Sequence, residues 1–173
     1  MKQVQTLLFV VVLALACVHV CQAGFPFGGT APEAECSAAS VMGLEQCPGT
    51  DGEAIQIRNV AFVPSTLTIG SEVTVSGEMS VRSALTKVYL QIYIENSPIR
   101  GPFNEFSVDV CSEAEMRGED LCPIPPTDGY VAFSNPVTVP GFPLIPGHYC
   151  GNITALDVNM QAVGCALFNV QLN

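Results

Sequence analysis

The amino-acid sequence predicts an all-β fold, a sandwich of two antiparallel sheets, and three observations favour it. Short runs alternate apolar and polar residues with a period of two and are rich in β-branched and aromatic side chains. Clusters rich in Gly, Pro, Asn and Asp separate these runs, as turns do. The sequence shows no heptad repeat and no long helical period.

The first three strands are the clearest. They are AIQIRNVAFV (54–63), SEVTVSGEMSV (71–81) and TKVYLQIYIE (86–95). The third run places four aliphatic residues on one face: Val88, Leu90, Ile92 and Ile94. Because alternate side chains of a strand point to opposite faces, this row predicts a buried face.

Four further runs complete a set of about seven or eight strands, a number typical of an antiparallel sandwich. They are EFSVDVC (105–111), GYVAFS (129–134), NITALDV (152–158) and CALFNVQL (165–172). Residues 24–46 are rich in Gly, Pro and Ala and predict an irregular lead-in, with at most a short helical turn near Ala38–Leu44.

Residues 1–23 have the three-part pattern of a secretory signal peptide: an early Lys2, an apolar run and a small Ala23 before Gly24. A membrane anchor would need about 20 apolar residues with stronger flanking charge. We therefore expect a mature chain of residues 24–173 that is secreted or lies in the lumen of a lysosome-like compartment.

The chain is strongly acidic. Its formal net charge is −10, and loss of Lys2 with the signal peptide would make it −11. Such a surface repels phosphate backbones, which excludes nucleic acid as a partner.

Six cysteines would remain in the mature chain, an even number that predicts three disulfides in an exported protein. Six cysteines allow 15 pairings. A zinc site is not expected, because residues 24–173 contain no C-x-x-C pair and only one histidine, His148. We expect neither a metal nor another cofactor.

Catalytic chemistry is not expected either. His148 lies in a Pro-rich segment, and the chain has no G-x-S-x-G motif. The acidic stretch Glu113–Asp120 lacks the spaced oxygen ligands of a calcium loop and predicts a solvated hairpin tip. Asn152-Ile153-Thr154 is a glycosylation sequon, which predicts an exposed Asn152.

The segment VPGFPLIPGHYCGNI (139–153) combines loop-forming prolines and glycines with large apolar side chains. Exposed apolar clusters of this kind mark contacts with a ligand, a membrane or a partner. Together with DVCSEAEMRGEDLCPI, GYVAF and GCALFNVQL, this segment resembles the second half of an ML domain, and IRNVAFVPSTLTIGSEVTVSGE resembles its opening strands.

The ML lipid-recognition family includes the Niemann–Pick lysosomal sterol-transfer protein and the endotoxin coreceptor, and the present loop is most similar to its phosphatidylglycerol/phosphatidylinositol transfer branch. The resemblance covers residues 47–173. It implies an immunoglobulin-like sandwich with an apolar cavity between the sheets, and disulfides Cys47–Cys165 and Cys111–Cys122. Cys36 and Cys150 are then left for each other.

The resemblance implies a non-enzymatic carrier that holds a phospholipid or sterol. Ten apolar residues would line the cavity: Val88, Leu90, Ile92, Ile94, Phe106, Val108, Val110, Phe133, Phe168 and Val170. Six would form its mouth: Pro98, Ile99, Phe103, Phe142, Leu144 and Ile145. We expect a monomer whose mouth touches a membrane or a lipid donor protein. The alternative is an immunoglobulin-like recognition module without a lipid.

Overall fold

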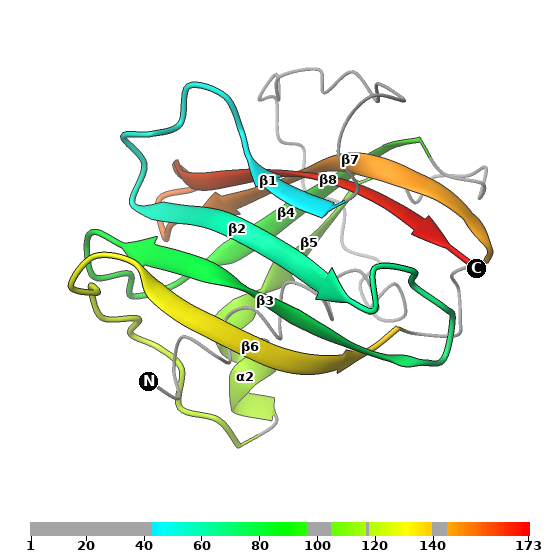
Figure 1. Ribbon diagram of the computed structural model, residues 1–173. Coiled ribbons are helices and arrows are strands. Elements are labelled where there is room, and N and C mark those ends of the chain that lie inside the picture. Colours follow the sequence, from blue (N-terminus) through cyan, green and yellow to red (C-terminus); the bar gives the residue numbers. More distant parts are fainter. Residues whose placement is uncertain (1–42, 97–104, 117, 140–144) are drawn as a thin grey trace.

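The computed structural model describes residues 43–96, 105–116, 118–139 and 145–173. Its strands form two antiparallel sheets that face each other (Figure 1). One sheet has the strand order β1-β8-β7-β4-β5, and the other has the order β2-β3-β6. The predicted all-β sandwich is therefore confirmed.

The strands of the five-stranded sheet are β1 Gly43–Gln46, β4 Tyr89–Asn96, β5 Glu105–Asp109, β7 Gly147–Leu156 and β8 Ala162–Leu172. Those of the three-stranded sheet are β2 Ile55–Val63, β3 Glu72–Val81 and β6 Val131–Thr138. A short helix, α2 Val110–Met116, follows β5. Among the described residues, no helix is long and apolar enough to cross a membrane.

The β7–β8 hairpin is the longest pairing in the five-stranded sheet. Its turn is held by Asp157, whose Oδ1 accepts hydrogen bonds from the backbone N–H groups of Asn159 (2.8 Å) and Gln161 (2.9 Å). The bond from Gln161 contributes most to lowering the pKa of this carboxyl. An aspartate that accepts bonds from its own backbone two residues on is a standard turn former, and here it sets the register of the hairpin.

The pairing of β4 with β7 contains an irregularity that requires glycine. The register shifts between Ile94 and Asn96, next to Gly151 of β7. A Cβ atom at Gly151 would overlap the carbonyl oxygen of Tyr93. The close approach of the two backbones therefore depends on the missing side chain.

A bulge in β2 keeps its apolar residues facing the gap between the sheets. The register with β3 shifts between Arg58 and Ala61, and Asn59 adopts a positive φ of 54°. Ile57 is paired with Met79 before the bulge, and Phe62 with Val75 after it. The extra residue thus restores the alternation that would otherwise turn Phe62 to solvent.

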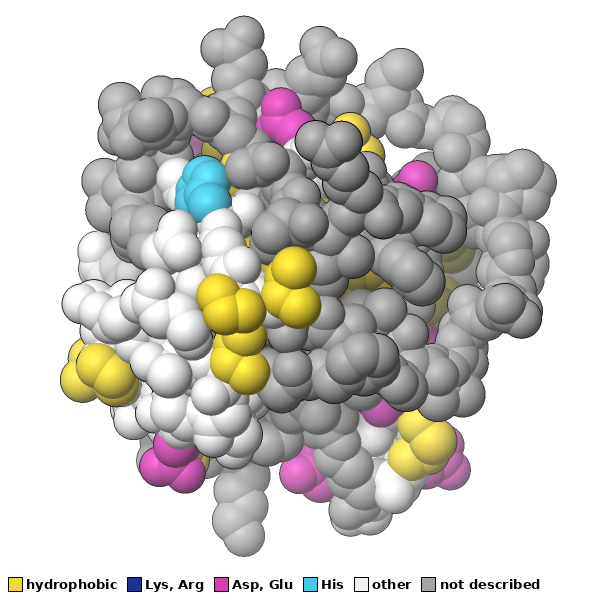
Figure 2. Space-filling model, turned by 90° about the vertical axis from the view of Figure 1, so that its right-hand side faces the viewer, with side chains coloured by type: hydrophobic (Ala, Val, Ile, Leu, Met, Phe, Trp, Pro, Cys, Tyr) yellow, Lys and Arg dark blue, Asp and Glu magenta, His cyan; other side chains and the backbone are white. Residues whose placement is uncertain are grey.

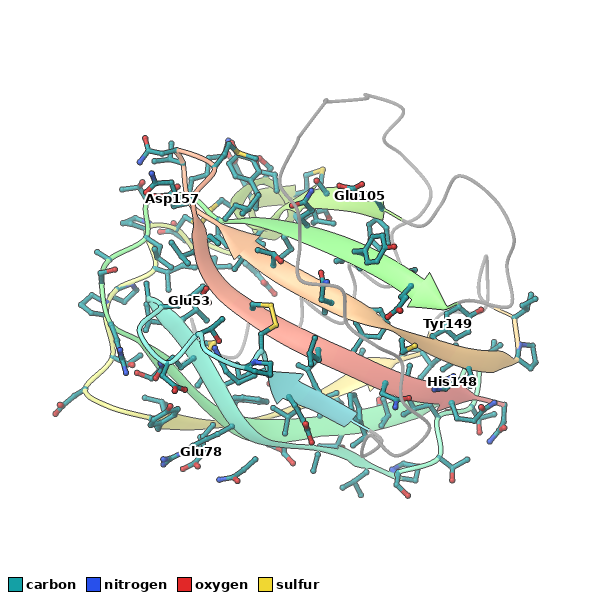
Figure 3. The ribbon with its side chains drawn as sticks, turned by 90° about the horizontal axis from the view of Figure 1, so that it is seen from above. Glu53, Glu78, Glu105, His148, Tyr149 and Asp157 are labelled. Atoms are coloured by element: carbon teal, nitrogen blue, oxygen red, sulfur yellow. A yellow bond between two sulfur atoms is a disulfide. The ribbon has the colours of Figure 1, made fainter. Side chains whose placement is uncertain are left out.

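The core lies between the two sheets, where inward-facing residues of every long strand are buried. This sandwich has two ends. The disulfide end carries the β7–β8 turn and the segment before β2, and the loop end is where β7 begins. Figure 3 shows Glu53 and Asp157 at the disulfide end and His148 and Tyr149 at the loop end.

Two local predictions are wrong. Gly43–Gln46 form β1 rather than the end of an irregular lead-in, and Leu44 lies in that strand rather than in a helical turn. Backbone pairing with β8, from Gly43↔Asn169 to Gln46↔Ala166, overrides the local Gly-rich composition.

The second error concerns residues 110–116, which form α2 instead of a strand end and a hairpin tip. Asp109 acts as the N-cap, because its Oδ1 accepts the backbone N–H of Ser112 at 3.1 Å. Gly118, with φ of 74°, lies just past the helix, and its N–H bonds to the carbonyl of Glu115 at 2.8 Å. Val110 and Ala114 bury one side of this helix.

A candidate ligand cavity between the sheets

An apolar cavity of about 60 Å³ lies between the two sheets, nearer the disulfide end. The five-stranded sheet contributes Leu44, Gln46, Leu90, Ile153, Ala155, Gly164, Cys165 and Ala166 to its wall. The three-stranded sheet contributes Ile55, Ile57 and Met79, and Val88 lies just before β4. The predicted apolar space between the sheets is therefore present in the structure.

Small residues of β7 and β8 explain why this space is not filled. Ala155 pairs with Gly164, and the neighbouring Ala166 pairs with Ile153. A Cβ at Gly164 would stand 2.9 Å from the Cβ of Ile55, so β2 approaches β8 closely at this point. Beside this contact the two alanines leave room that larger side chains would occupy.

Sequence reasoning missed these three small residues. A signal was available, because Ala155, Gly164 and Ala166 occupy inward positions of runs that otherwise carry large apolar residues there. A cluster of small residues on one face of two paired strands indicates a space as much as a packed core.

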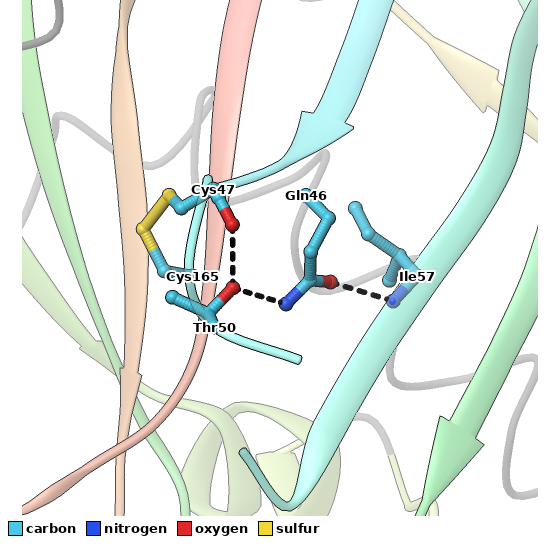
Figure 4. Close-up of a disulfide and its surroundings, with 5 residues drawn as sticks. All are labelled: Gln46, Cys47, Thr50, Ile57 and Cys165. Atoms are coloured by element: carbon cyan, nitrogen blue, oxygen red, sulfur yellow. Dashed lines mark hydrogen bonds between the residues drawn. A yellow bond between two sulfur atoms is a disulfide. The ribbon is translucent and has the colours of Figure 1, made fainter. Parts of the chain in front are cut away.

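Gln46 provides a side-chain hydrogen bond at the cavity wall. The side chain of Gln46 reaches from β1 to β2, where its Oε1 accepts the backbone N–H of Ile57 at 2.9 Å (Figure 4). Its Nε2 donates to Thr50 Oγ1 at 2.7 Å, and Thr50 Oγ1 donates to the carbonyl of Cys47 at 2.7 Å.

The disulfide Cys47–Cys165 fixes the end of β1 to β8 beside this network (Figure 4). The second disulfide, Cys111–Cys122, joins α2 to the segment that precedes β6. Both pairings were implied by the family resemblance and both are present. The pairing of Cys36 with Cys150 stays a prediction, because Cys36 lies outside the described residues.

The structure divides the ten predicted wall residues. Val88 and Leu90 line the cavity. Seven others are buried in the core but do not border this space: Ile92, Ile94, Val108, Val110, Phe133, Phe168 and Val170. Phe106 is half-buried and packs against the core. Contact of these eight residues with a ligand stays a prediction.

Most of the predicted mouth lies outside the described residues, namely Pro98, Ile99, Phe103, Phe142 and Leu144. Ile145 is described and is 45% exposed. Tyr149 is buried, and its hydroxyl bonds to both the N–H (3.2 Å) and the carbonyl (3.0 Å) of Ile145. This pair of bonds holds Ile145 in place at the loop end.

Figure 2 faces the loop end. Hydrophobic side chains of described residues gather there near a histidine, acidic side chains lie around the rim, and no described Lys or Arg side chain is visible on this face. The described part of this end therefore offers apolar contact without positive charge.

The ionisable side chains of the described residues lie away from the cavity wall. Arg58 pairs with Glu78 at 2.8 Å, and this hydrogen bond is the main cause of the lowered pKa of Glu78. Burial raises the pKa of Glu53, which lies in the turn that contains Thr50. A ligand in the cavity would therefore meet hydrocarbon and one neutral amide.

Residues considered for chemistry do not assemble into a reactive site within the described ranges. His148 Nε2 lies 2.5 Å from Asn169 Oδ1. No group of three or more His, Cys, Asp or Glu side chains there could hold a metal ion. Glu113 and Glu115, from the acidic stretch, lie on α2.

The expected exposure of Asn152 is wrong. Its side chain is only 1% exposed, and its Nδ2 has no hydrogen-bond partner among the described residues. Asn152 lies in the middle of the five-stranded sheet, paired with Tyr93 on one side and Leu167 on the other. A glycan needs a surface position, so its attachment here stays a prediction that this packing does not favour.

Comparisons with known proteins identify the family. The family model of the ML domain matches residues 42–172. No curated protein matches the sequence. Among solved structures, a Niemann–Pick type C2 protein from Japanese carpenter ant is similar, with 13% identity and a TM-score of 0.49, covering 75% of this chain and 98% of the other. Chicken MD-1 complexed with lipid IVa has 16% identity and a TM-score of 0.46, covering 74% and 86%.

Proposed function

The chain belongs to the ML domain family, and on that premise we propose that it is a secreted, non-enzymatic protein that carries a lipid between its two sheets. The observation that carries this proposal is the apolar cavity, which is bordered by both sheets and lined almost wholly by hydrocarbon. The disulfides Cys47–Cys165 and Cys111–Cys122 are typical of proteins outside the reducing cytosol and support an extracellular or lumenal location.

The cavity is smaller than a typical ligand pocket. Ligand pockets have volumes of about 300–1,000 Å³, whereas this cavity has about 60 Å³. An empty space of about 300 Å³ would cost about 7 kcal/mol, a large part of the 5–15 kcal/mol that stabilises a typical domain. At the same rate the observed cavity costs about 1.4 kcal/mol. The space must therefore widen when a lipid binds, and the lipid has to offset the cost of the larger pocket.

The hydrocarbon of a bound lipid would offset this cost. Each methylene group moved from water into an apolar site contributes about 0.8 kcal/mol, so ten would offset the cost of a pocket of about 300 Å³. A phospholipid acyl chain and a sterol both offer this much hydrocarbon. We propose one of these two as the ligand.

Lipid content tests this proposal directly. We expect organic extraction of the purified protein, followed by mass spectrometry, to release about one lipid per chain. A protein that yields none, and that takes up neither a fluorescent sterol nor a fluorescent phospholipid, would instead fit the immunoglobulin-like recognition module.

Transfer between membranes is the finer part of the proposal. Ile145 is exposed at the loop end, and Phe142 and Leu144 precede it in sequence. We propose that these residues touch a membrane surface or a donor protein. Changing Phe142 and Leu144 to Ser should slow lipid exchange between vesicles several-fold and leave the melting temperature nearly unchanged. If the melting temperature falls while exchange is unaffected, the two residues belong to the core.

A further inference from the structure

The edges of the two sheets meet beside the cavity without forming a strand ladder. Gln46 lies on β1, at the edge of the five-stranded sheet, and Ile57 lies on β2, at the edge of the three-stranded sheet. Among the described strands, β1 pairs only with β8, and β2 pairs only with β3 and not with β1. We call the junction of these two edges the β1–β2 seam. The Gln46–Ile57 hydrogen bond crosses it (Figure 4).

The two partners of this bond belong to different sheets. Gln46 is held on the five-stranded sheet, because its amide donates to Thr50, Thr50 donates to Cys47, and Cys47 is bonded to Cys165 of β8. The Ile57 N–H belongs to the backbone of the three-stranded sheet. Any movement that separates the sheets at this seam therefore pulls the acceptor away from the donor.

A lipid needs more space than the cavity offers, and the seam borders this space. The cavity of about 60 Å³ must widen to admit hydrocarbon, and Gln46 and Ile57 both line it. Widening at the seam leaves the Gln46 oxygen and the Ile57 N–H facing hydrocarbon, and polar groups left unpaired in an apolar site are unfavourable. The other residues that line the described cavity offer no strong side-chain donor or acceptor to replace the lost partner, because only Met79 and the disulfide-bonded Cys165 carry a polarisable atom, a weakly accepting sulfur.

A single hydroxyl group can satisfy both orphaned atoms, because it is at once a donor and an acceptor. We propose that the ligand carries one neutral hydroxyl that inserts at the β1–β2 seam, donates to Gln46 Oε1 and accepts from the Ile57 N–H. An ether or ester oxygen can accept from Ile57 but gives Gln46 nothing. A charged head group would find no described cation in the wall. This inference rests on the proposed function and specifies the polar part of the lipid.

Paired probes test the hydroxyl requirement. The protein would be incubated with an equimolar mixture of hexadecanol and its methyl ether, and separately with a sterol and its 3-O-methyl ether. Retained lipid would be measured by mass spectrometry after gel filtration. On the scaffold that the protein accepts, we expect the wild type to favour the alcohol about three- to tenfold, the effect of one neutral hydrogen bond.

Gln46→Leu should reduce this preference to near one, because only the Ile57 N–H remains and the ether satisfies it equally. Thr50→Val is the matched control. It removes the bond that orients Gln46 but keeps the Gln46 oxygen, so the preference for the alcohol should survive. Gln46→Met, which keeps the length of the side chain, replaces Gln46→Leu if the leucine variant does not fold.

The outcomes separate the two proposals. Retention of alcohol and ether in equal amounts by the wild type, or an unchanged preference in the Gln46 variants, would overturn the role of the seam and leave lipid binding intact. Failure of the wild type to retain any of the four probes would also overturn the role of the seam, and extraction of the purified protein together with uptake of a fluorescent phospholipid would then decide whether it carries a lipid at all.

Discussion

The two halves of the β7–β8 hairpin face the same gap between the sheets but fill it differently. Toward the disulfide end, Ala155, Gly164 and Ala166 leave the cavity. Toward the loop end, the inward positions of the same two strands carry Tyr149 and Phe168, which are buried at 4% and 3% exposure. The same backbone pairing therefore supports a space in one half and a filled core in the other, and side-chain volume alone makes the difference.

Backbone contacts reinforce this contrast. Toward the loop end, backbone hydrogen bonds connect the segment before β3 to the end of β8. The Ile69 N–H donates to the carbonyl of Asn173, and the Asn173 N–H donates to the carbonyl of Leu67. At the β1–β2 seam, one side-chain hydrogen bond takes the place of these backbone bonds. The sheets are thus held firmly at the filled half and weakly beside the cavity.

Removing a large side chain from the filled half should have the largest effect. We expect Phe168→Ala to lower the free energy of unfolding by about 3–5 kcal/mol, because it removes buried contacts and leaves a new cavity. Urea denaturation measures this loss. A loss below about 1 kcal/mol would mean that the filled half has spare room as well, and the contrast between the halves would be lost.

The ion pair between Lys87 and Asp109 lies outside both halves of the hairpin. Its removal should change the stability of the protein least. Partial burial raises the pKa of Asp109, but hydrogen bonds from Lys87 and Ser112 together outweigh it and hold the pKa below its ordinary value. A lowered carboxyl pKa stabilises the fold above the pKa of the unfolded state, and this contribution is lost as the pH falls through the folded-state pKa.

Asp109→Asn keeps an N-cap and removes the ion pair with Lys87. We expect it to cost less than about 1 kcal/mol at pH 7, as for other partly exposed pairs. The difference from the wild type should start to shrink as the pH falls below about 3.9, the ordinary pKa of an aspartate in an unfolded chain, and should vanish once the pH has fallen through the lower folded-state pKa of Asp109. Thermal unfolding of the wild type and of Asp109→Asn, at pH 7 and in acid, measures this difference. A difference that grows in acid would contradict the lowered pKa of Asp109.

Much of the fold was predictable from local pattern. The alternation in 54–63, 71–81 and 86–95 closely predicts β2, β3 and the body of β4, because one buried face imposes a period of two. The strand at Gly43–Gln46 was not predictable in this way, since it depends on pairing with β8, more than 100 residues later in the chain. The helix α2 was missed although Asp109 and Gly118, its caps, are visible in the sequence.

The site was less predictable than the fold. Val88 and Leu90 were expected to line the cavity and do so, but the inward pattern alone cannot tell a residue that borders a space from one that fills it. That distinction depends on which side chains lie opposite. Ala155 and Ala166 illustrate this dependence. They border the cavity because their small side chains leave volume that the residues opposite do not fill. Gln46 was missed because its role depends on a contact between the edges of two sheets.

Filling the cavity tests the central claim most directly. Ala155→Leu places three additional carbon atoms in the cavity, and Ala132→Leu makes the same change at an exposed position of β6. Uptake of a fluorescent lipid would be measured for both variants and the wild type, with melting temperatures to confirm folding. If lipid occupies the space between the sheets, Ala155→Leu will lose at least tenfold in uptake without a loss of stability, and Ala132→Leu will bind like the wild type. Equal uptake by all three folded proteins would contradict the claim.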